Sequence, residues 1–260
     1  MLSSKYRNRS FLLLLILLNT RSVFADIQSP SINSTQLNNA FISALMHGHP
    51  VFELGAYRGT QGNTQHINIQ DLIGDTFTVS DSHNNSGLVG LGYFIDGQIS
   101  NLFTISYGIN AFYLAATSVS GNVIQENLFT NLSYSYQLYH YPIYAMIKSA
   151  LNLNSPNYAL SIDGGVGPNF MRVNSFTENS LDGGVTIPEQ PFSSNTTTTF
   201  SATIGIGLKI NHAFGQIPIE IGYRFFYLGQ GHFKASSSQV LNNLKTGNVY
   251  ANAIVLSVGM

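Results

Sequence analysis

The chain has 260 residues, of which 44% are hydrophobic and 9% charged, with a formal net charge of −1 and no cysteine. A soluble globular protein usually has about 25% charged residues, so this composition argues against a surface that faces water throughout. The lack of cysteine excludes a disulfide framework and a thiolate metal site.

Residues 1–25 read as a secretory signal peptide. Three basic residues precede the apolar run at 11–18, and a polar stretch then ends at Ala25. This run is far shorter than the roughly 20 apolar residues that a membrane-spanning helix needs. Cleavage after Ala25 removes four of the eleven basic residues and leaves seven against twelve acidic ones. That balance, without a basic cluster, argues against nucleic acid as a partner.

Residues 26–50 are expected to form a periplasmic segment. Within it, Leu37, Phe41 and Leu45 recur four residues apart between positions 34 and 46, which predicts a short amphipathic helix. An eight-stranded lumen is filled by side chains, so the helix would lie across the periplasmic mouth. A leader without regular structure is the alternative.

From residue 51 onward, apolar side chains alternate with small or polar ones. In 217–227, isoleucine, tyrosine and phenylalanine occupy one parity, whereas Glu220, Gly222 and Arg224 occupy the other. Alternation with a period of two predicts a strand with two different faces. The pattern occurs in eight segments, 51–59, 87–96, 102–115, 131–151, 158–170, 200–210, 217–231 and 248–260. About ten residues suit a tilted strand that crosses a membrane.

The connections between these segments are alternately long and short. The short ones lie at 97–101, 152–157 and 211–216, and the long ones, rich in Asn, Ser, Thr, Gly and Asp, lie at 60–86, 116–130, 171–199 and 230–247. Short turns on one side and long loops on the other are typical of bacterial outer-membrane barrels. The sequence therefore predicts an all-β fold: an eight-stranded antiparallel transmembrane β-barrel over 51–260, preceded by a short helix.

The charged residues within the strands are expected to face the lumen. An arginine that faced lipid near the middle of the bilayer would cost about 2–4 kcal/mol, so the apolar parity must be the outer one. In 131–138 that parity holds Leu132, Tyr134, Tyr136 and Leu138. We expect a network of charges inside the barrel, with a structural role favoured over a proton or ion path; its members are Glu53, Asp163, Lys209, Glu220 and Arg224.

Tyrosines are expected to mark the two membrane interfaces, where their rings sit at the level of the lipid headgroups. Ordinary strand preference for aromatic residues is the alternative explanation. The candidates are Tyr57, Tyr93, Tyr107, Tyr113, Tyr134, Tyr158, Tyr223, Tyr227 and Tyr250.

The sequence favours a protein without enzymatic activity. His66, His83 and His232 fall in or beside long connections, but they lack paired metal-ligand spacing and a nucleophile motif. We therefore expect no catalytic residue, no cofactor and no metal. Glycine on the inner parity is explained by the close approach of strands in a small barrel.

Several runs resemble the small outer-membrane β-barrel domain family of Gram-negative bacteria. They are GYRFFYLGQGHF, GLGYF, YGINAFYL, GPNF and the closing YANAIVLS, and the likeness covers about 210 of the 260 residues. Relatives of the opacity, attachment and outer-membrane protein W types imply adhesion, host contact or passage of small apolar molecules. The family usually ends in an aromatic residue that the barrel assembly machinery reads, whereas this chain ends in Met260.

Three functions remain open at this stage. The favoured one is a structural or interaction protein of the outer membrane whose surface loops, 171–199 above all, contact host molecules or lipopolysaccharide. The second is a narrow channel for small solutes. The third is a soluble periplasmic barrel that binds an apolar ligand, which would need its apolar face inward and a charged exterior. Outer-membrane lipid and the barrel assembly machinery are the further expected partners.

Overall fold

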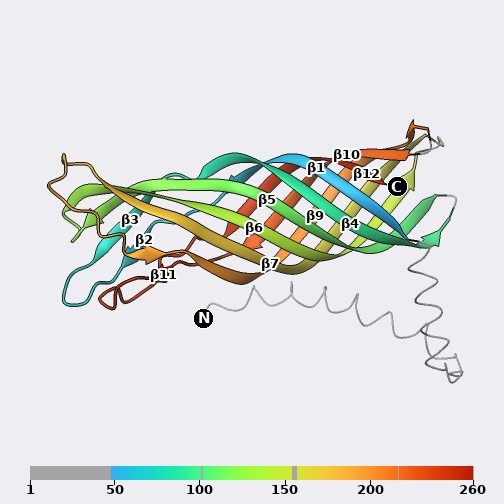
Figure 1. Cartoon of the computed structure of the whole chain (residues 1–260). Coiled ribbons are helices and arrows are strands. Elements are labelled where there is room, and N and C mark those ends of the chain that lie inside the picture. Colours follow the sequence, from blue (N-terminus) through green and yellow to red (C-terminus); the bar gives the residue numbers. More distant parts are fainter. Residues whose placement is uncertain (1–47, 101, 154–156, 216, 260) are drawn as a thin grey trace, which may run out of the picture. The chain divides into compact units, whose positions relative to one another are not determined.

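The computed structural model describes residues 48–100, 102–153, 157–215 and 217–259 (Figure 1). The predicted signal peptide, the helix at 34–46 and Met260 lie outside the described residues. The described part is all β, with twelve strands: β1 (His49–Thr60), β2 (Gln65–Ile67), β3 (Asp75–Asp81), β4 (His83–Ile99), β5 (Phe103–Gln125), β6 (Phe129–Asn152), β7 (Tyr158–Ser180), β8 (Phe192–Ser193), β9 (Asn195–Phe214), β10 (Ile217–Gly229), β11 (Lys234–Ala235) and β12 (Val249–Gly259). None of its segments is a helix long and apolar enough to cross a membrane.

Eight of these strands form a closed ring. Each pairs antiparallel with its neighbour in the order β1, β4, β5, β6, β7, β9, β10, β12, and β12 returns to β1. Leu54 of β1, for example, lies opposite Val89 of β4 on one side and Leu256 of β12 on the other. Closure leaves no unpaired edge in the wall, which is the condition for a sheet to span lipid. The eight predicted strands and the antiparallel barrel are therefore confirmed.

The strands are longer than expected on the side of the long connections. β5, β6 and β7 have 23, 24 and 23 residues, about twice what a bilayer crossing requires. The prediction of a long loop at 116–130 was therefore wrong, because β5 runs to Gln125 and β6 begins at Phe129. Most of 171–199 is strand too. A long polar stretch reads as a loop by composition, but a strand that leaves the membrane is equally polar on its outer face.

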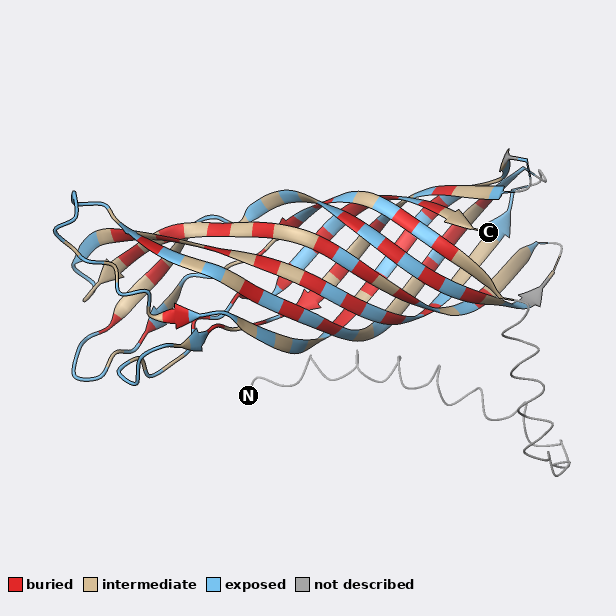
Figure 2. Cartoon of the chain, in the orientation of Figure 1, coloured by how far each residue is buried: buried red, intermediate tan, exposed pale blue. Residues whose placement is uncertain are grey.

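In the half of the barrel near the short turns, the faces are arranged as in a membrane protein. The outward Leu54 and Ile109 are 62% and 63% exposed, whereas the inward Glu53 and Arg224 are only 6% exposed. Buried and exposed residues alternate along every strand of the ring (Figure 2). Apolar side chains that are half exposed around a closed ring form a belt for lipid.

In the other half the polarity reverses, as β6 shows. Near the short turns its outward residues include Ile143 and Ile147, 42% and 50% exposed. Farther along, its outward residues are Ser133, Ser135 and Gln137, and the inward ones are buried. The expectation that the apolar parity of 131–138 faces lipid was therefore wrong; the buried inward residues there are Leu132, Tyr134, Tyr136 and Leu138. This end of the barrel is built for water outside and an apolar core inside.

Bulges in β5 and β7 lie where the apolar and polar faces of these strands are exchanged. In β5 the register shifts between Leu114 and Thr117, and the inward residues pass from even to odd positions. In β7, Ser175 has a φ of 54° and the inward residues pass from odd to even. A bulge places two residues opposite one, so the side chains beyond it exchange faces. Sequence parity cannot be followed through such a position.

The water-facing end is closed by the long connections, which we call the head together with the strand ends that they cover (Figure 1). β2 pairs with β3, β3 extends the wall along the far part of β5, and β8 pairs with β11. Gln65 and Lys245, 180 residues apart, exchange two hydrogen bonds of 2.6 and 2.9 Å. Inside the head six aromatic rings lie in mutual contact; they are Phe77, Tyr134, Tyr136, Phe176, Phe192 and Phe233.

The prediction that tyrosines mark the membrane interfaces was wrong for two of them. Tyr57 and Tyr134 were expected at the membrane interfaces but are buried inside the barrel, 3% and 2% exposed. The Tyr57 hydroxyl donates a 2.5 Å hydrogen bond to the Ala115 carbonyl. Outward and partly exposed tyrosines include Tyr93, Tyr107, Tyr113, Tyr141, Tyr158, Tyr223 and Tyr250.

The two halves of the wall should respond oppositely to the same substitution. Leu54→Arg places a charge in the lipid belt and should lower the free energy of unfolding by about 2–4 kcal/mol. Asn179→Arg, on the outer face of β7 in the head, should change it by less than about 0.5 kcal/mol. Urea unfolding in phospholipid vesicles measures the free energy of unfolding of both variants. Equal losses would contradict the conclusion that one half of the wall faces lipid and the other faces water.

Candidate functional site: the barrel lumen

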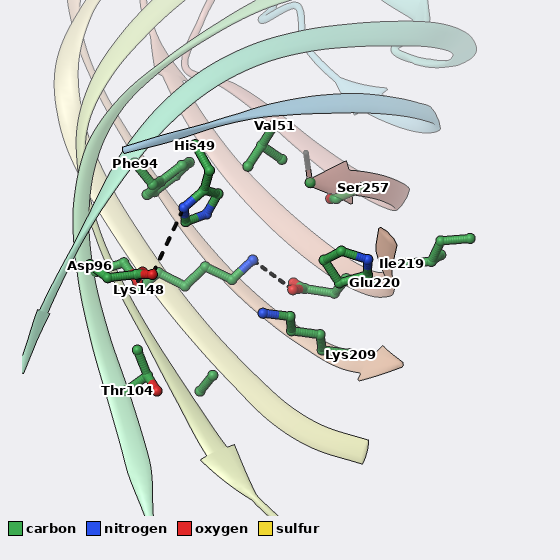
Figure 3. Close-up of a pocket in the computed structure, with 14 residues that line it drawn as sticks. His49, Val51, Phe94, Asp96, Thr104, Lys148, Lys209, Ile219, Glu220 and Ser257 are labelled. Atoms are coloured by element: carbon green, nitrogen blue, oxygen red, sulfur yellow. Dashed lines mark hydrogen bonds and ion pairs between the residues drawn. The ribbon is translucent and has the colours of Figure 1, made fainter. Parts of the chain in front are cut away.

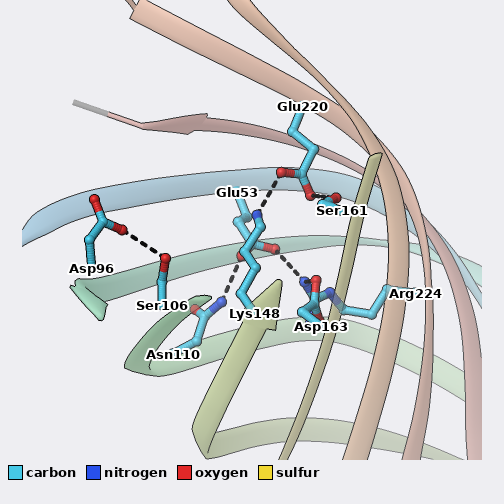
Figure 4. Close-up of polar contacts among 9 residues, drawn as sticks. All are labelled: Glu53, Asp96, Ser106, Asn110, Lys148, Ser161, Asp163, Glu220 and Arg224. Atoms are coloured by element: carbon cyan, nitrogen blue, oxygen red, sulfur yellow. Dashed lines mark hydrogen bonds and ion pairs between the residues drawn. The ribbon is translucent and has the colours of Figure 1, made fainter. Parts of the chain in front are cut away.

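The centre of the lumen holds a buried ion-pair cluster around Arg224 of β10. Its Nη1 lies 2.8 Å from Asp163 Oδ1, and its Nη2 donates a 3.0 Å hydrogen bond to Asp163 Oδ2 (Figure 4). Glu53 of β1 approaches from the other side, with Oε2 3.8 Å from Arg224 Nη2. The guanidinium carbon also lies 5.3 Å from the centre of the Phe112 ring. A paired carboxylate, a second carboxylate and an aromatic face all compensate one buried cation.

Glycines between these residues explain why the cluster fits. Gly205 of β9 lies opposite both Arg224 and Asp163 in the ladder, and a Cβ atom there would lie 2.9 Å from Asp163 Oδ2. Gly90 stands in the same way between Glu53 and Phe112. Small residues on the inner parity thus leave room for large charged ones on the neighbouring strands.

A second pair lies nearer the short turns. Lys148 Nζ of β6 is 2.6 Å from Glu220 Oε2, and Ser161 Oγ donates a 2.8 Å hydrogen bond to Glu220 Oε1 (Figure 4). Lys148 was not among the expected network residues. It shares the even, inward parity of Tyr144 and Met146. If β6 is treated as one unbroken strand, this parity alone predicts that Lys148 faces the lumen.

The five expected residues thus divide. Glu53, Asp163 and Arg224 meet in one cluster, whereas Glu220 takes Lys148 as its partner. Lys209 lies opposite Glu220 in the ladder, but in the described part of the chain it forms no ion pair within 4.0 Å. Lys209 instead lines the cavity at the end of the barrel.

This cavity of about 200 Å³ occupies the mouth near the short turns (Figure 3). Its polar lining comes from seven strands and includes His49, Asp96, Ser106, Lys148, Lys209, Glu220 and Ser257. Ser106 Oγ donates a 2.7 Å hydrogen bond to Asp96 Oδ1. His49 Nδ1 lies 4.0 Å from the other oxygen of Asp96.

Beyond the ion pairs the lumen is filled. Phe112, Tyr144 and Phe226 contact one another across it and are at most 3% exposed. Leu114, Leu138 and the aromatic core of the head follow in the same direction. Chemically, the lumen cross-links the wall by ion pairs and aromatic packing.

The histidines in the head make local contacts. His66 is hydrogen-bonded to Thr76 Oγ1 at 3.1 Å and to the Ile73 carbonyl at 2.9 Å, and His83 is 3.0 Å from the adjacent Ser82 Oγ. The described residues contain no group of three or more His, Cys, Asp or Glu side chains placed to hold a metal ion.

The closed antiparallel ring of eight strands with an apolar outer belt and ionic residues inside decides the class. The chain has the fold of a small outer-membrane β-barrel. Its lipid belt places it in the outer membrane, because antiparallel pairing closes the wall all the way round and the outward side chains suit acyl chains.

The chain was compared with known proteins. No protein-family model and no curated protein matches the chain. It is similar to the outer membrane protease OmpT from Escherichia coli, with a TM-score of 0.46 and 7% identity over 82% of this chain and 94% of that one. Neisserial surface protein A matches with a TM-score of 0.42 and 12% identity over 81% of this chain and 96% of that one. OprG from Pseudomonas aeruginosa matches with a TM-score of 0.42 and 13% identity over 82% of this chain and 97% of that one. At these identities and TM-scores the likeness carries no statement about activity.

Removing the central cation should destabilise the barrel. Arg224→Met leaves Asp163 and Glu53 buried without a positive partner, and we expect a loss of about 3–5 kcal/mol in the free energy of unfolding. Lys209→Met, which breaks no ion pair, should cost less than about 1 kcal/mol. Adding Asp163→Asn and Glu53→Gln to Arg224→Met should restore much of the loss. Urea titration in vesicles tests the set; equal losses for Arg224→Met and Lys209→Met would refute the assignment.

Proposed function

We propose that this protein is a surface-exposed structural or interaction protein, in which a transmembrane barrel holds a rigid head outside the cell. The observation that carries the proposal is the continuation of the wall: β5, β6 and β7 extend about ten residues beyond a bilayer crossing. A protein that needed only an anchor would turn at the interface. Here the extra strand length encloses a packed core of its own.

The turns of the head carry exposed apolar side chains. Leu128, Val185 and Ile187 are 71%, 83% and 77% exposed at the turns farthest from the membrane belt. Exposed aliphatic side chains on a rigid support are typical of contact surfaces rather than of solvated linkers. They support contact with host molecules, the partner class that the long connections first suggested.

Lipopolysaccharide is the second proposed partner. Arg58 of β1 and Arg172 of β7 both point outward and are exposed. Arg172 lies opposite Tyr139 of β6, beside the outward Tyr141, where the wall changes from apolar to polar. Guanidinium groups at that level match the phosphates of the outer leaflet in charge and geometry. Insertion by the barrel assembly machinery is proposed as for other barrels of this type.

The alternatives receive less support. A channel needs a continuous lumen, and the ion pairs and the rings of Phe112, Tyr144 and Phe226 fill this one. A soluble periplasmic barrel needs a charged exterior, whereas the outward Leu54, Ile109 and Ile204 are more than half exposed. For a metal-dependent enzymatic role, the described residues offer no group of three or more His, Cys, Asp or Glu side chains placed to hold the ion.

Single cysteines test the orientation, because the natural chain has none. Leu128→Cys in the head should react with a membrane-impermeant maleimide on intact cells. His212→Cys, an exposed position near the end of β9 beside the short turn to β10, should react only after the outer membrane is permeabilised. Labelling of His212→Cys alone on intact cells would reverse the proposed topology.

Planar-bilayer recordings separate the structural role from the channel. We expect no discrete conductance steps from the purified protein, since the lumen is blocked at two successive layers. Steps that disappear when a side chain of the mouth, such as Lys209, is enlarged by Lys209→Trp would instead favour conduction.

A further inference from the structure

The head contains a cavity of about 180 Å³ whose lining is both apolar and acidic. It lies between β3, the ends of β5, β6 and β7, and the connections after β7 and β11. Its apolar side is formed by Ile67, Phe77, Leu132 and Val240, of which the first three are at most 3% exposed. Its rim carries amide and hydroxyl groups; they belong to Gln125, Gln190, Ser236, Ser237 and Gln239.

Three carboxylates line this cavity, and they come from three separate segments. Asp75 begins β3, Glu178 lies near the end of β7, and Glu189 lies in the connection that follows. None of the ion pairs in the described part of the chain includes any of the three, and no lysine or arginine lines the cavity. The negative charge of the cavity is therefore left without a cation.

Glu178 is the most deeply placed of the three. Its residue is 5% exposed, and the hydrogen-bond donors to its carboxylate are the backbone N–H groups of Gln190, at 3.3 Å, and Glu189. Neither donor is charged. A carboxylate held inside an apolar-walled cavity by neutral donors alone is an unusual arrangement, since a buried charge is normally paired.

We propose that this cavity binds an alkylammonium or guanidinium group on an apolar stem, presented from outside the cell. The cationic end would meet Glu178, Asp75 and Glu189, and the stem would pack on Phe77 and Leu132. The size suits a lysine or arginine side chain or a short free amine. A metal ion is disfavoured, because the described carboxylates are not placed to ligate one. The proposal rests on the outward orientation of the head.

The electrostatics of the site support this ligand class. Burial, helped by the negative charges of Asp75 and Glu189 and opposed by the two backbone hydrogen bonds, raises the pKa of Glu178 to about 7. Burial also raises the pKa of Asp75. The residue of β6 opposite Glu178 is the buried Tyr134. At Asp75 the negative charge of Glu126 adds to the rise in pKa, and the nearby His66 opposes it. A bound cation would favour the ionised form of Glu178.

Binding should consequently weaken as the pH falls. The folded-state pKa of Glu178 is above its ordinary value, so the carboxylate loses its charge as the pH drops through about 7. We expect the affinity for an ammonium probe to be several-fold lower at about pH 5.5 than at about pH 8.

The test uses the whole mature chain in detergent micelles and two probes, the peptide Ac-Gly-Lys-Gly-NH2 and the free diamine 1,5-diaminopentane, followed by calorimetric titration. Both should bind, and the same peptide with an acetylated lysine should not. Preference for the peptide indicates a protein side chain as the natural source, and preference for the diamine indicates a free amine. Equal binding of the acetylated peptide, or no binding of either amine at about pH 8, overturns the proposal.

Matched variants make the result specific. Glu178→Gln should weaken binding about tenfold or more, whereas Asp182→Asn, an exposed acid of the head outside the cavity, should leave it unchanged. Glu178→Gln should not unfold the head. At about pH 8 the ionised carboxylate destabilises the folded state, because its folded pKa is raised, so this variant should have a Tm at least equal to that of the natural chain.

The outcome is separable from that of the proposed topology. If Leu128→Cys proves inaccessible on intact cells while both amines bind in micelles, the orientation fails and the site stands. If Leu128→Cys is labelled and Glu178→Gln binds the amines as well as the natural chain does, the site fails and the orientation stands.

Discussion

This structure depends on one constraint: a single closed β-sheet wall must lie in lipid over one half of its length and in water over the other. Every strand of the ring satisfies its backbone through its neighbours, so the wall itself is indifferent to lipid or water. Only the side chains can suit the two solvents, and along one strand the outward side chains change from apolar in the membrane to polar in water. The outward face of β6 passes from Ile147 and Ile143, through Tyr141 and Tyr139, to Gln137 and the serines beyond. The membrane boundary on β6 therefore lies at those two tyrosines.

The interior follows from the same constraint. In the membrane half the aliphatic residues lie mainly on the outer face. The inner face combines glycine, serine and aromatic residues with charged residues that must pair with one another. Arg224 compensates two carboxylates, and Gly205 provides the space beside them. In the head the inner face becomes apolar, and rings such as Phe77 and Phe233 form a core like that of a soluble protein. Between the cavity at the mouth and the cavity of the head, the ion pairs and aromatic rings pack across the lumen.

The connections of the head are joined into one hydrogen-bonded structure. Its connections are joined by hydrogen bonds between residues 174 to 180 positions apart, such as those that link Asn68 with Asn242 and Gln65 with Lys245. This long-range pairing fixes the rim of the acidic cavity, whose three carboxylates lie on different segments. A preformed cavity loses little conformational entropy on binding, which fits a surface that recognises small cationic groups.

The sequence by itself determined the class, the strand number and the inward position of the charges, because period-two alternation and the cost of charge in lipid are local properties. It could not place the membrane boundary on β5 and β7, since the bulges near Leu114 and Ser175 exchange the faces. Nor could it assign partners: Glu220 is opposite Lys209 in the ladder yet pairs with Lys148 across the lumen. Only closure of the ring decided that choice, because the distance between side chains on non-adjacent strands depends on how far the ring curves.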